Sequence, residues 1–198
     1  MSLPENDVFY ETIVITENSH INSAALSALR KGGYIYLRSF KGSNTFENLL
    51  RDRRFSVNYI SHENKGIFID AAVKGWGNEE QEIDESEIII EPFPHLKKAD
   101  GWALCQVENM RKERIRDEIG ETEIMHVEAR ILFWEGSAEN AIKVGEDRNI
   151  MALVAYTRFL ISEGKVREKF RNMAMKLADR RDVVGRWVKK ALLMEILK

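Results

Sequence analysis

A chain of 198 residues is long enough for one domain, or for one domain with a small additional unit. Its 44% hydrophobic and 31% charged residues are typical of a folded globular protein and exclude a disordered chain. The single cysteine excludes an internal disulfide and a cysteine-built zinc site. The sequence has no apolar run near the roughly 18 residues of a membrane span, and its N-terminus does not resemble a signal peptide. We therefore expect a cytoplasmic protein.

The net charge of -2 is unevenly distributed along the chain. Residues 1–146 hold 17 basic and 26 acidic side chains, whereas residues 147–198 hold 13 basic and 6 acidic ones. Such a change in sign favours two structural units, which we place at residues 1–145 and 146–198. Two ordinary solvated surfaces, or a basic part that docks onto the acidic part, are alternative explanations.

The first unit has the pattern of β-structure. β-branched residues, alternating apolar positions and short polar or glycine-containing links predict strands, with a hairpin turn at 17–20 and another at 116–120. Short links favour antiparallel pairing, and many antiparallel strands predict a small barrel. Further apolar runs occur at 67–69 and 88–90. The predicted strands are residues 11–16, 21–29, 34–37, 54–60, 103–115 and 122–134.

One short helix is predicted to follow the third strand. Asn44 and Glu47, three residues apart, form a helix-start signature, and an apolar face follows over 46–50. The start of a helix exposes unpaired backbone N–H groups and a partial positive charge, which suit a phosphate. The residues that add cations, hydroxyls or a permissive backbone around this start are Arg38, Lys41, Gly42, Ser43 and Thr45. An ordinary capped helix with exposed basic neighbours is the alternative.

The second unit has the helical period. We predict that Asp147 caps the first helix and that Gly164 ends it, with three amphipathic helices forming a small bundle. The expected apolar stripes are Ile150, Met151, Val154 and Ile161; Val166, Phe170, Met173 and Leu177; and Val184, Trp187, Val188, Ala191 and Leu192.

Residue patterns for other chemistry are weak. The four histidines are scattered, so a histidine-based metal site is poorly supported, and His126 within a strand is expected to be packed or hydrogen-bonded. Cys105 lies in an apolar strand and is expected to be a buried, inert thiol. The sequence has no phosphate-loop, dinucleotide-binding or nucleophile-elbow motif.

The basic second unit leaves a nucleic-acid interface open as an alternative function. Acidic residues interrupt the basic positions, and no recognised nucleic-acid-binding motif accompanies them, so a solvated or docking face is favoured. The basic positions are Lys165, Arg167, Lys169, Arg171, Arg180, Arg181, Arg186, Lys189 and Lys190.

The order of several short motifs resembles the flavin-reductase-like and pyridoxamine-phosphate-oxidase-like split barrels. These motifs are Asn22-x-Ala24-x-x-Ser27, Lys41-x-x-x-Thr45-x-x-Asn48 and Phe55-x-Val57-Asn58. The runs 10–14 and 37–45, together with the helical tail, resemble more closely a largely archaeal family, domain of unknown function four-four-seven. The resemblance covers most of the chain and implies an FMN-binding split β-barrel that forms a homodimer, with FMN near the subunit interface.

The resemblance also implies residue roles. Asn22, Ala24 and Ser27 would line the flavin ring and ribityl chain, although this chain has Ala25, Leu26 and Ser27 where the family usually has Pro, Met and Gly. Asn44 belongs to the predicted cofactor-binding loop. The phosphate would be held by Arg38, Lys41, Ser43 and Thr45, and further polar contacts would come from Asn48 and Asn58.

The expected function is that of a flavin-dependent oxidoreductase of unknown substrate, because the cofactor supplies the redox chemistry. Proteins with such barrels oxidise a vitamin phosphate, reduce flavin with a nicotinamide, or only bind the cofactor. A non-catalytic FMN-binding or sensing module is therefore the alternative. The sequence does not indicate a general acid or base beside the pocket.

Overall fold

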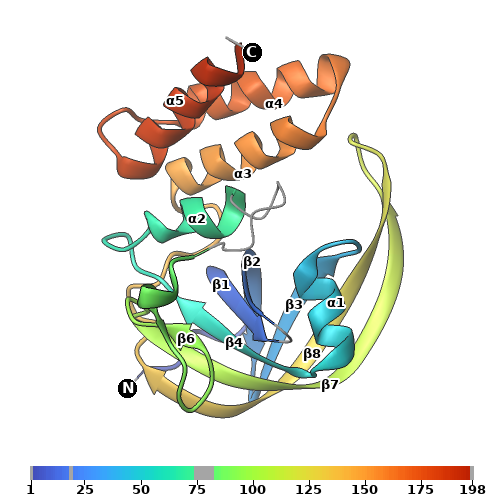
Figure 1. The fold of residues 1–198 in the computed structure, drawn as a ribbon, viewed down its shortest axis with the longest axis vertical. Coiled ribbons are helices and arrows are strands. Elements are labelled where there is room, and N and C mark those ends of the chain that lie inside the picture. The colour runs from blue at the N-terminus through green and yellow to red at the C-terminus, as the bar shows by residue number, and fades with distance from the viewer. Residues whose placement is uncertain (1, 18–19, 74–82, 197–198) are drawn as a thin grey trace. The chain divides into compact units, whose positions relative to one another are not determined.

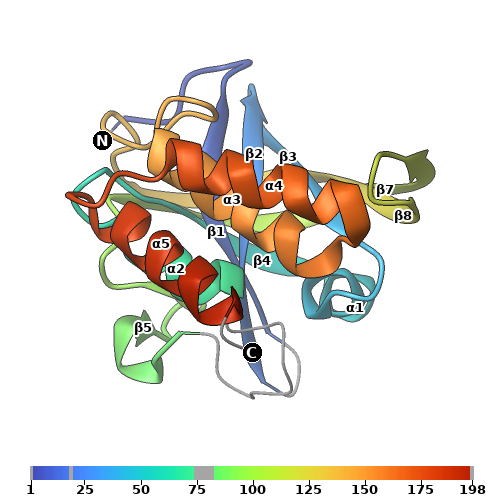
Figure 2. The ribbon, with the colours of Figure 1, turned by 90° about the horizontal axis from the view of Figure 1, so that it is seen from above.

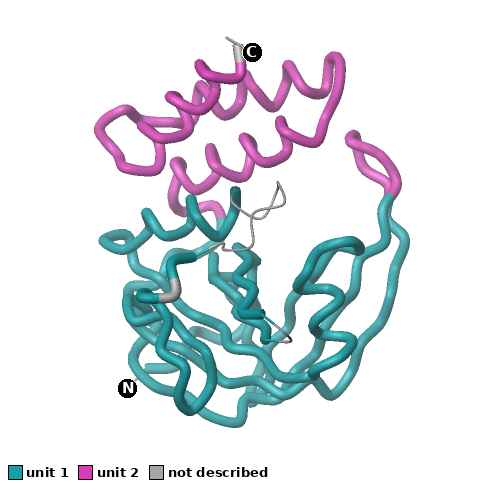
Figure 3. Tube along the Cα trace, viewed as in Figure 1, with its two compact units in different colours: residues 1–115, 122–144 teal, residues 116–121, 145–198 magenta. Residues whose placement is uncertain are grey.

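A computed structural model describes residues 2–17, 20–73 and 83–196 of the chain. The chain divides into two compact units, which Figure 3 distinguishes by colour. The first unit comprises Met1–Ile115 and Thr122–Val144, and the second comprises Arg116–Glu121 and Gly145–Lys198.

Six strands form a closed barrel in the first unit, in the order β1-β2-β3-β8-β7-β4 (Figure 1). Neighbouring strands pair antiparallel, as β1 and β2 do with Glu11 opposite Ser27, and β3 and β8 with Arg38 opposite His126. The predicted barrel is therefore confirmed, whereas part of the predicted turn at 17–20 lies outside the described residues. The strands are β1 (Phe9–Glu17), β2 (Ile21–Lys31), β3 (Tyr34–Phe40), β4 (Arg54–Tyr59), β7 (Gly101–Arg116) and β8 (Glu121–Gly136).

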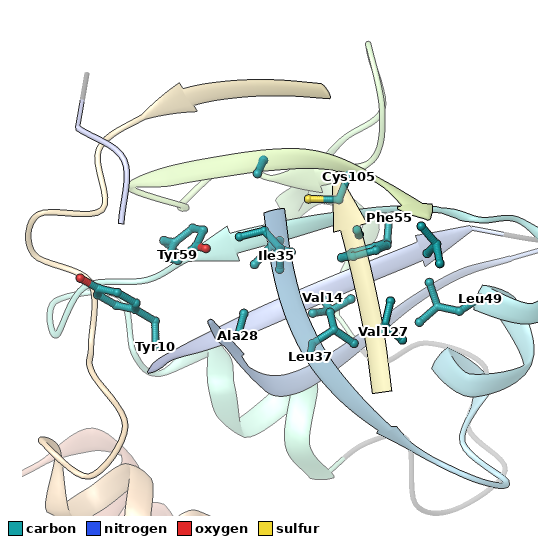
Figure 4. Packing of buried hydrophobic residues seen from close by; sticks show 14 of the residues in the cluster. Tyr10, Val14, Ala28, Ile35, Leu37, Leu49, Phe55, Tyr59, Cys105 and Val127 are labelled. Atoms are coloured by element: carbon teal, nitrogen blue, oxygen red, sulfur yellow. The ribbon is translucent and has the colours of Figure 1, made fainter. Parts of the chain in front are cut away.

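Apolar side chains from all six strands fill the barrel (Figure 4). Val14, Leu37, Phe55 and Val127 are among the core residues that are almost fully buried. Because side chains alternate along a strand, residues of the opposite parity face outward. Cys105 is fully buried in this core, and burial raises the pKa of its thiol, in agreement with the predicted inert thiol.

Two helices and a small sheet complete the first unit. Helix α1 (Asn44–Arg51) packs against β1, β2 and β3, and helix α2 (Ile67–Val73) packs against β2. The apolar run at 67–69 is therefore the start of a helix. A 3-10 helix, η2 (Glu85–Glu87), precedes the two-stranded sheet of β5 (Ile88–Ile89) and β6 (His95–Leu96).

Three helices make up most of the second unit: α3 (Arg148–Ile161), α4 (Gly164–Leu177) and α5 (Val183–Ile196). Helices α3 and α4 run side by side, and α5 packs against both (Figure 2). Asp147 caps α3 as predicted, because its carboxylate accepts hydrogen bonds from the backbone N–H groups of Asn149 and Ile150.

Parts of the predicted helical stripes are wrong. Val154, Ile161 and Met173 are 44%, 43% and 40% exposed. Helix α3 buries a face that includes Tyr156 and Phe159, whereas α4 buries the predicted Phe170 together with Ala174. Gly164 begins α4, while α3 already ends at Ile161. The stripe of α5 is confirmed, since its members are buried or half-buried.

Candidate functional site

Four polar side chains form a buried cluster where α1 meets β1 and β2. Asn22 donates amide hydrogen bonds to Thr45 Oγ1 over 2.9 Å and to Thr16 Oγ1 over 3.2 Å. Asn48 donates to the same Thr16 oxygen over 3.0 Å. All four side chains are at most 8% exposed. The structure thus brings together three predicted site residues, and their polar groups fix the position of α1 on the barrel wall.

Helix α1 begins one residue earlier than the sequence predicted. Its N-cap is Ser43, whose hydroxyl accepts from Phe46 N over 3.1 Å and donates to the carbonyl of Phe40 over 2.8 Å. Asn44 is the first helical residue, so its predicted capping role is wrong. The Ser43 hydroxyl is used by the cap, and the backbone N–H groups of Asn44 and Thr45 lack an intrahelical acceptor.

The loop before α1 carries one of the predicted cations, Lys41, whereas Arg38 lies within β3. Gly42 has a φ of 84°, a left-handed conformation that favours glycine, and the loop turns there into the helix. Lys41 Nζ lies 3.9 Å from Glu123 Oε1, and Lys112 Nζ from β7 lies at the same distance from that oxygen. Lys112 also lies over the ring of Phe46. No local motif indicates Lys112 as a neighbour of this loop, because β7 is distant from the loop along the chain.

A row of polar residues crosses the outer face of β1, β2, β3, β8 and β7. Glu11 lies opposite Ser27, and the Ser27 hydroxyl donates to Glu11 Oε2 over 3.3 Å. Ala28 of β2 pairs with Leu37 of β3, so the next residue, Arg38, lies on the same face as Ser27. In the pairing of β3 with β8, Arg38 lies directly opposite His126. His126 Nε2 lies 2.7 Å from Glu113 Oε2. We call these residues the outer row; it joins two predicted residues, Ser27 and Arg38, with three unpredicted ones.

The remaining predicted residues lie elsewhere. Ala24 lies opposite Val14 in the register and therefore shares the inward-facing side of that core residue. Asn58 is fully buried; its amide donates to the carbonyl of Ile13 and to Ser56 Oγ, and its oxygen accepts from Leu96 N. The Asn58 side chain therefore joins β4 to β1 and β6.

Two ionisable groups in the outer row have different environments. The pKa of Glu11 is raised because the carboxyl is largely buried, and the hydrogen bond from Ser27 partly opposes this rise. His126 of β8 is hydrogen-bonded, as predicted, and its partner is Glu113 of β7. Glu113 also pairs with Arg111, whose Nη2 lies 3.3 Å from Glu113 Oε2.

No group of three or more His, Cys, Asp or Glu side chains in the described ranges is arranged to hold a metal ion. Similarly, within those ranges, no helix is both long enough and apolar enough to cross a bilayer.

Several cations of the helical unit have partners inside that unit. The guanidinium of Arg167 lies 4.5 Å from the centre of the Phe159 ring, and that of Arg158 lies 5.6 Å from the centre of the Phe170 ring. Arg181 forms an ion pair with Asp179 over 2.9 Å, and hydrogen bonds from Arg181 lower the pKa of Asp179 to about 2. These cations stabilise contacts of the helical unit itself.

Solved structures share this fold. The FMN-bound protein MM1853 from Methanosarcina mazei has a TM-score of 0.67 and 20% identity, over 96% of this chain and 97% of that chain. The NADH:FAD oxidoreductase SgcE6 of Streptomyces globisporus C-1027 has a TM-score of 0.53 and 10% identity, over 69% and 80% of the two chains. An FMN-binding protein from Thermus thermophilus has a TM-score of 0.52 and 12% identity, over 66% and 73%.

The family whose model matches this chain is the same one that its strand and loop motifs resemble. The family model described as "Protein of unknown function (DUF447) N-terminal domain" matches residues 10–136, which include the entire outer row and helix α1. The chain belongs to the DUF447 family.

Proposed function

We propose that this chain is an FMN-binding flavoprotein and that it acts as a flavin-dependent oxidoreductase. The main support for FMN binding is the fold that this chain shares, over 96% of its length, with the FMN-bound protein MM1853. FMN, when bound, supplies the redox chemistry, and the protein binds and orients it.

The residues at the start of α1 fit a phosphate. Arg38 and Lys41 are exposed cations on either side of the end of β3, and the N–H groups of Asn44 and Thr45 are available as donors. We assign phosphate binding to these groups. In this proposal Ser43 acts by capping the helix, because its hydroxyl is already hydrogen-bonded to Phe46 N, to the carbonyl of Phe40 and to the hydroxyl of Ser39.

The other predicted residues receive direct or supporting roles. Ser27 lies beside Arg38 on the outer face, and we assign it to the flavin ring. Asn22, Thr45 and Asn48 position α1 through the buried cluster. Ala24 and Asn58 support the strands on which the site is built.

The oxidoreductase activity is the finer part of the proposal, and its substrate is not assigned. The flavin-binding domain corresponds to residues 1–145 and the helical domain to residues 146–198. We also propose a cytoplasmic location, with which the free thiol of Cys105 agrees. We propose no nucleic-acid function, because several cations of the helical unit contact that unit's own aromatic and acidic side chains.

A homodimer with FMN near the subunit interface completes the proposal. Leu29 and Tyr36 lie on the outer face of β2 and β3 near Ser27, and Phe40 is 50% exposed. A second copy of the chain would remove this apolar surface from water. Sedimentation equilibrium with and without FMN is expected to give twice the monomer mass, and a monomer at all concentrations would overturn this part.

FMN binding is tested by titrating the purified, flavin-free chain with FMN and with riboflavin while following flavin fluorescence. We expect saturable binding, with riboflavin weaker because it lacks the phosphate. The absence of saturable FMN binding would overturn the proposed function. Anaerobic mixing of the FMN complex with NADH or NADPH then separates the two alternatives: reduction of the flavin supports an oxidoreductase, and no reduction by either donor supports a binding or sensing module.

A further inference from the structure

Glu11 is an acidic residue in the barrel wall. The proposed cofactor contacts do not include it. It lies on β1 directly opposite Ser27 of β2, and its carboxylate accepts the hydrogen bond of the Ser27 hydroxyl over 3.3 Å. Its side chain lies on the outer face, opposite in parity to the core residues Tyr10 and Val14. The carboxylate and the residue assigned to the flavin ring are therefore directly joined.

The surroundings of Glu11 offer little to neutralise a negative charge. On β2 its diagonal neighbours, Ala25 and Leu29, are apolar. On its other side, its backbone N–H donates to the carbonyl of Ile142 over 2.8 Å. Within the ranges that the structure describes, no cation forms an ion pair with this carboxylate.

Three charged groups on the segments around β1 and β2 are relevant to the Glu11 carboxylate. Lys143 lies opposite Tyr10, and its ammonium donates to Glu5 Oε1 over 2.7 Å. Helix α2, which packs against β2, carries Asp70. Arg38, the next outer-row residue after Ser27, lies on β3, two strands away from Glu11 in the sheet order. Burial with one hydroxyl partner agrees with the raised pKa of Glu11.

The direction of the hydrogen bond determines what Ser27 can offer to a ligand. An ionised carboxylate only accepts hydrogen bonds, so the single hydroxyl hydrogen of Ser27 must point to Glu11. The lone pairs of Ser27 then remain for a donor group of the ligand. A protonated Glu11 can donate instead, which frees the Ser27 hydrogen and reverses the polarity that the ligand meets.

We propose that Glu11 is a positioning residue that holds Ser27 as a hydrogen-bond acceptor, and that its charge lowers the midpoint potential of a flavin bound against Ser27. This inference rests on the proposed FMN binding. A nearby negative charge opposes the addition of electrons to the flavin, and partial burial strengthens the effect.

The test compares Glu11→Gln with Glu17→Gln in the complete FMN-loaded protein. Glu17 lies on the same strand and the same face, six residues away, which is about 20 Å along a strand. The midpoint potential is measured with redox dyes across a pH series. Protonation of the flavin itself affects all variants equally, so it cancels in the difference between each variant and the wild type.

We expect the midpoint potential of Glu11→Gln to exceed that of the wild type at a pH above the pKa of Glu11. The difference should vanish at a pH well below it, where the wild-type carboxyl is also neutral. Glu17→Gln should match the wild type throughout. Equal potentials of Glu11→Gln and the wild type at every pH, with FMN bound, would overturn this inference and leave the proposed function intact; a wild type that binds no FMN would overturn both.

A second measurement needs no cofactor. Carbon-13 NMR of the flavin-free protein, labelled at glutamate carboxyl carbons, follows the titration of Glu11 in the wild type and in Ser27→Ala. Loss of the hydroxyl that stabilises the charged form should raise the pKa of Glu11 further. An identical titration in both proteins would contradict the coupling between Glu11 and Ser27.

Discussion

Asn48 of α1 donates an amide hydrogen to Thr16 Oγ1 of β1 over 3.0 Å, at a point where both side chains are buried. Asn22 donates to the same oxygen over 3.2 Å. One hydroxyl oxygen thus serves two amides from two different elements. The position of α1, and of the N–H groups that we assign to a phosphate, therefore depends on Thr16. Thr16 belongs to none of the motifs that the sequence shares with the split barrels.

Thr16→Val keeps the shape of the side chain but removes the shared acceptor. Two buried amide hydrogens lose a partner, and a buried unsatisfied polar group costs about 1–3 kcal/mol. We expect the free energy of unfolding in urea to fall by about that amount, and FMN affinity to fall with it. Thr16→Ser retains the oxygen and should recover most of the FMN affinity. If valine and serine variants behave alike, the cluster does not position α1.

Replacing Arg38 tests the assignment of the phosphate. Arg38→Met removes an exposed cation while retaining an unbranched apolar chain. We expect FMN affinity to fall by about tenfold, the effect of losing one charge-assisted hydrogen bond. Riboflavin affinity should hardly change, since riboflavin has no phosphate. Fluorescence titrations with both ligands measure the difference.

Arg51→Met is the matched control for this experiment. Arg51 is also exposed, but it lies in the last turn of α1, at the opposite end of the helix from the proposed phosphate. Its FMN affinity should equal that of the wild type. An equal loss in Arg38→Met and Arg51→Met would indicate a general effect of charge and would contradict the assignment.

Local patterns in the sequence were sufficient for much of the fold. The strands, the cap at Asp147 and the buried stripe of α5 follow from alternation, capping chemistry and helical period, all of which act within a few residues. The position of the α1 cap was wrong by one residue, because Ser43 and Asn44 both have side chains suited to capping.

The outer row could not be predicted in the same way. Glu11 and Ser27 are neighbours through the register of β1 and β2, and Arg38 and His126 are neighbours through the register of β3 and β8. Strand alternation indicates which residues share a face but leaves open which residue of the partner strand lies opposite. The same limit concealed Thr16, whose partners come from β2 and α1.

Glu11 also gives folding stability a defined pH dependence. Its pKa in the folded protein is raised above the ordinary value by burial, so the folded state binds a proton more tightly than the unfolded state. This contribution is fully present below the unfolded pKa, and it is lost as the pH rises through the higher folded pKa. Urea unfolding of Glu11→Gln across this window should lack that loss, while Glu17→Gln should retain it. Parallel pH profiles of Glu11→Gln and the wild type would contradict the prediction.

Gly185 is expected to resist even the smallest enlargement. A Cβ added there would lie 2.3 Å from the carbonyl oxygen of Asp179 and 2.5 Å from Asn149 Oδ1. The same Asn149 oxygen accepts the backbone N–H of Asp179 over 2.8 Å, a contact that links the start of α3 to the segment before α5. Alanine normally favours a helix interior over glycine by about 1 kcal/mol, but here the steric conflict should reverse the sign.

We therefore expect Gly185→Ala to lower the free energy of unfolding by about 1–3 kcal/mol, as overpacking does in other cores. Gly33→Ala is the matched control, since a Cβ at Gly33 would meet no atom within 4 Å. Its free energy of unfolding should stay within about 0.5 kcal/mol of the wild type. Urea unfolding followed by far-ultraviolet circular dichroism measures both variants. A Gly185→Ala protein as stable as the wild type would mean that the segment before α5 can move away from the helix without losing its contact with Asn149.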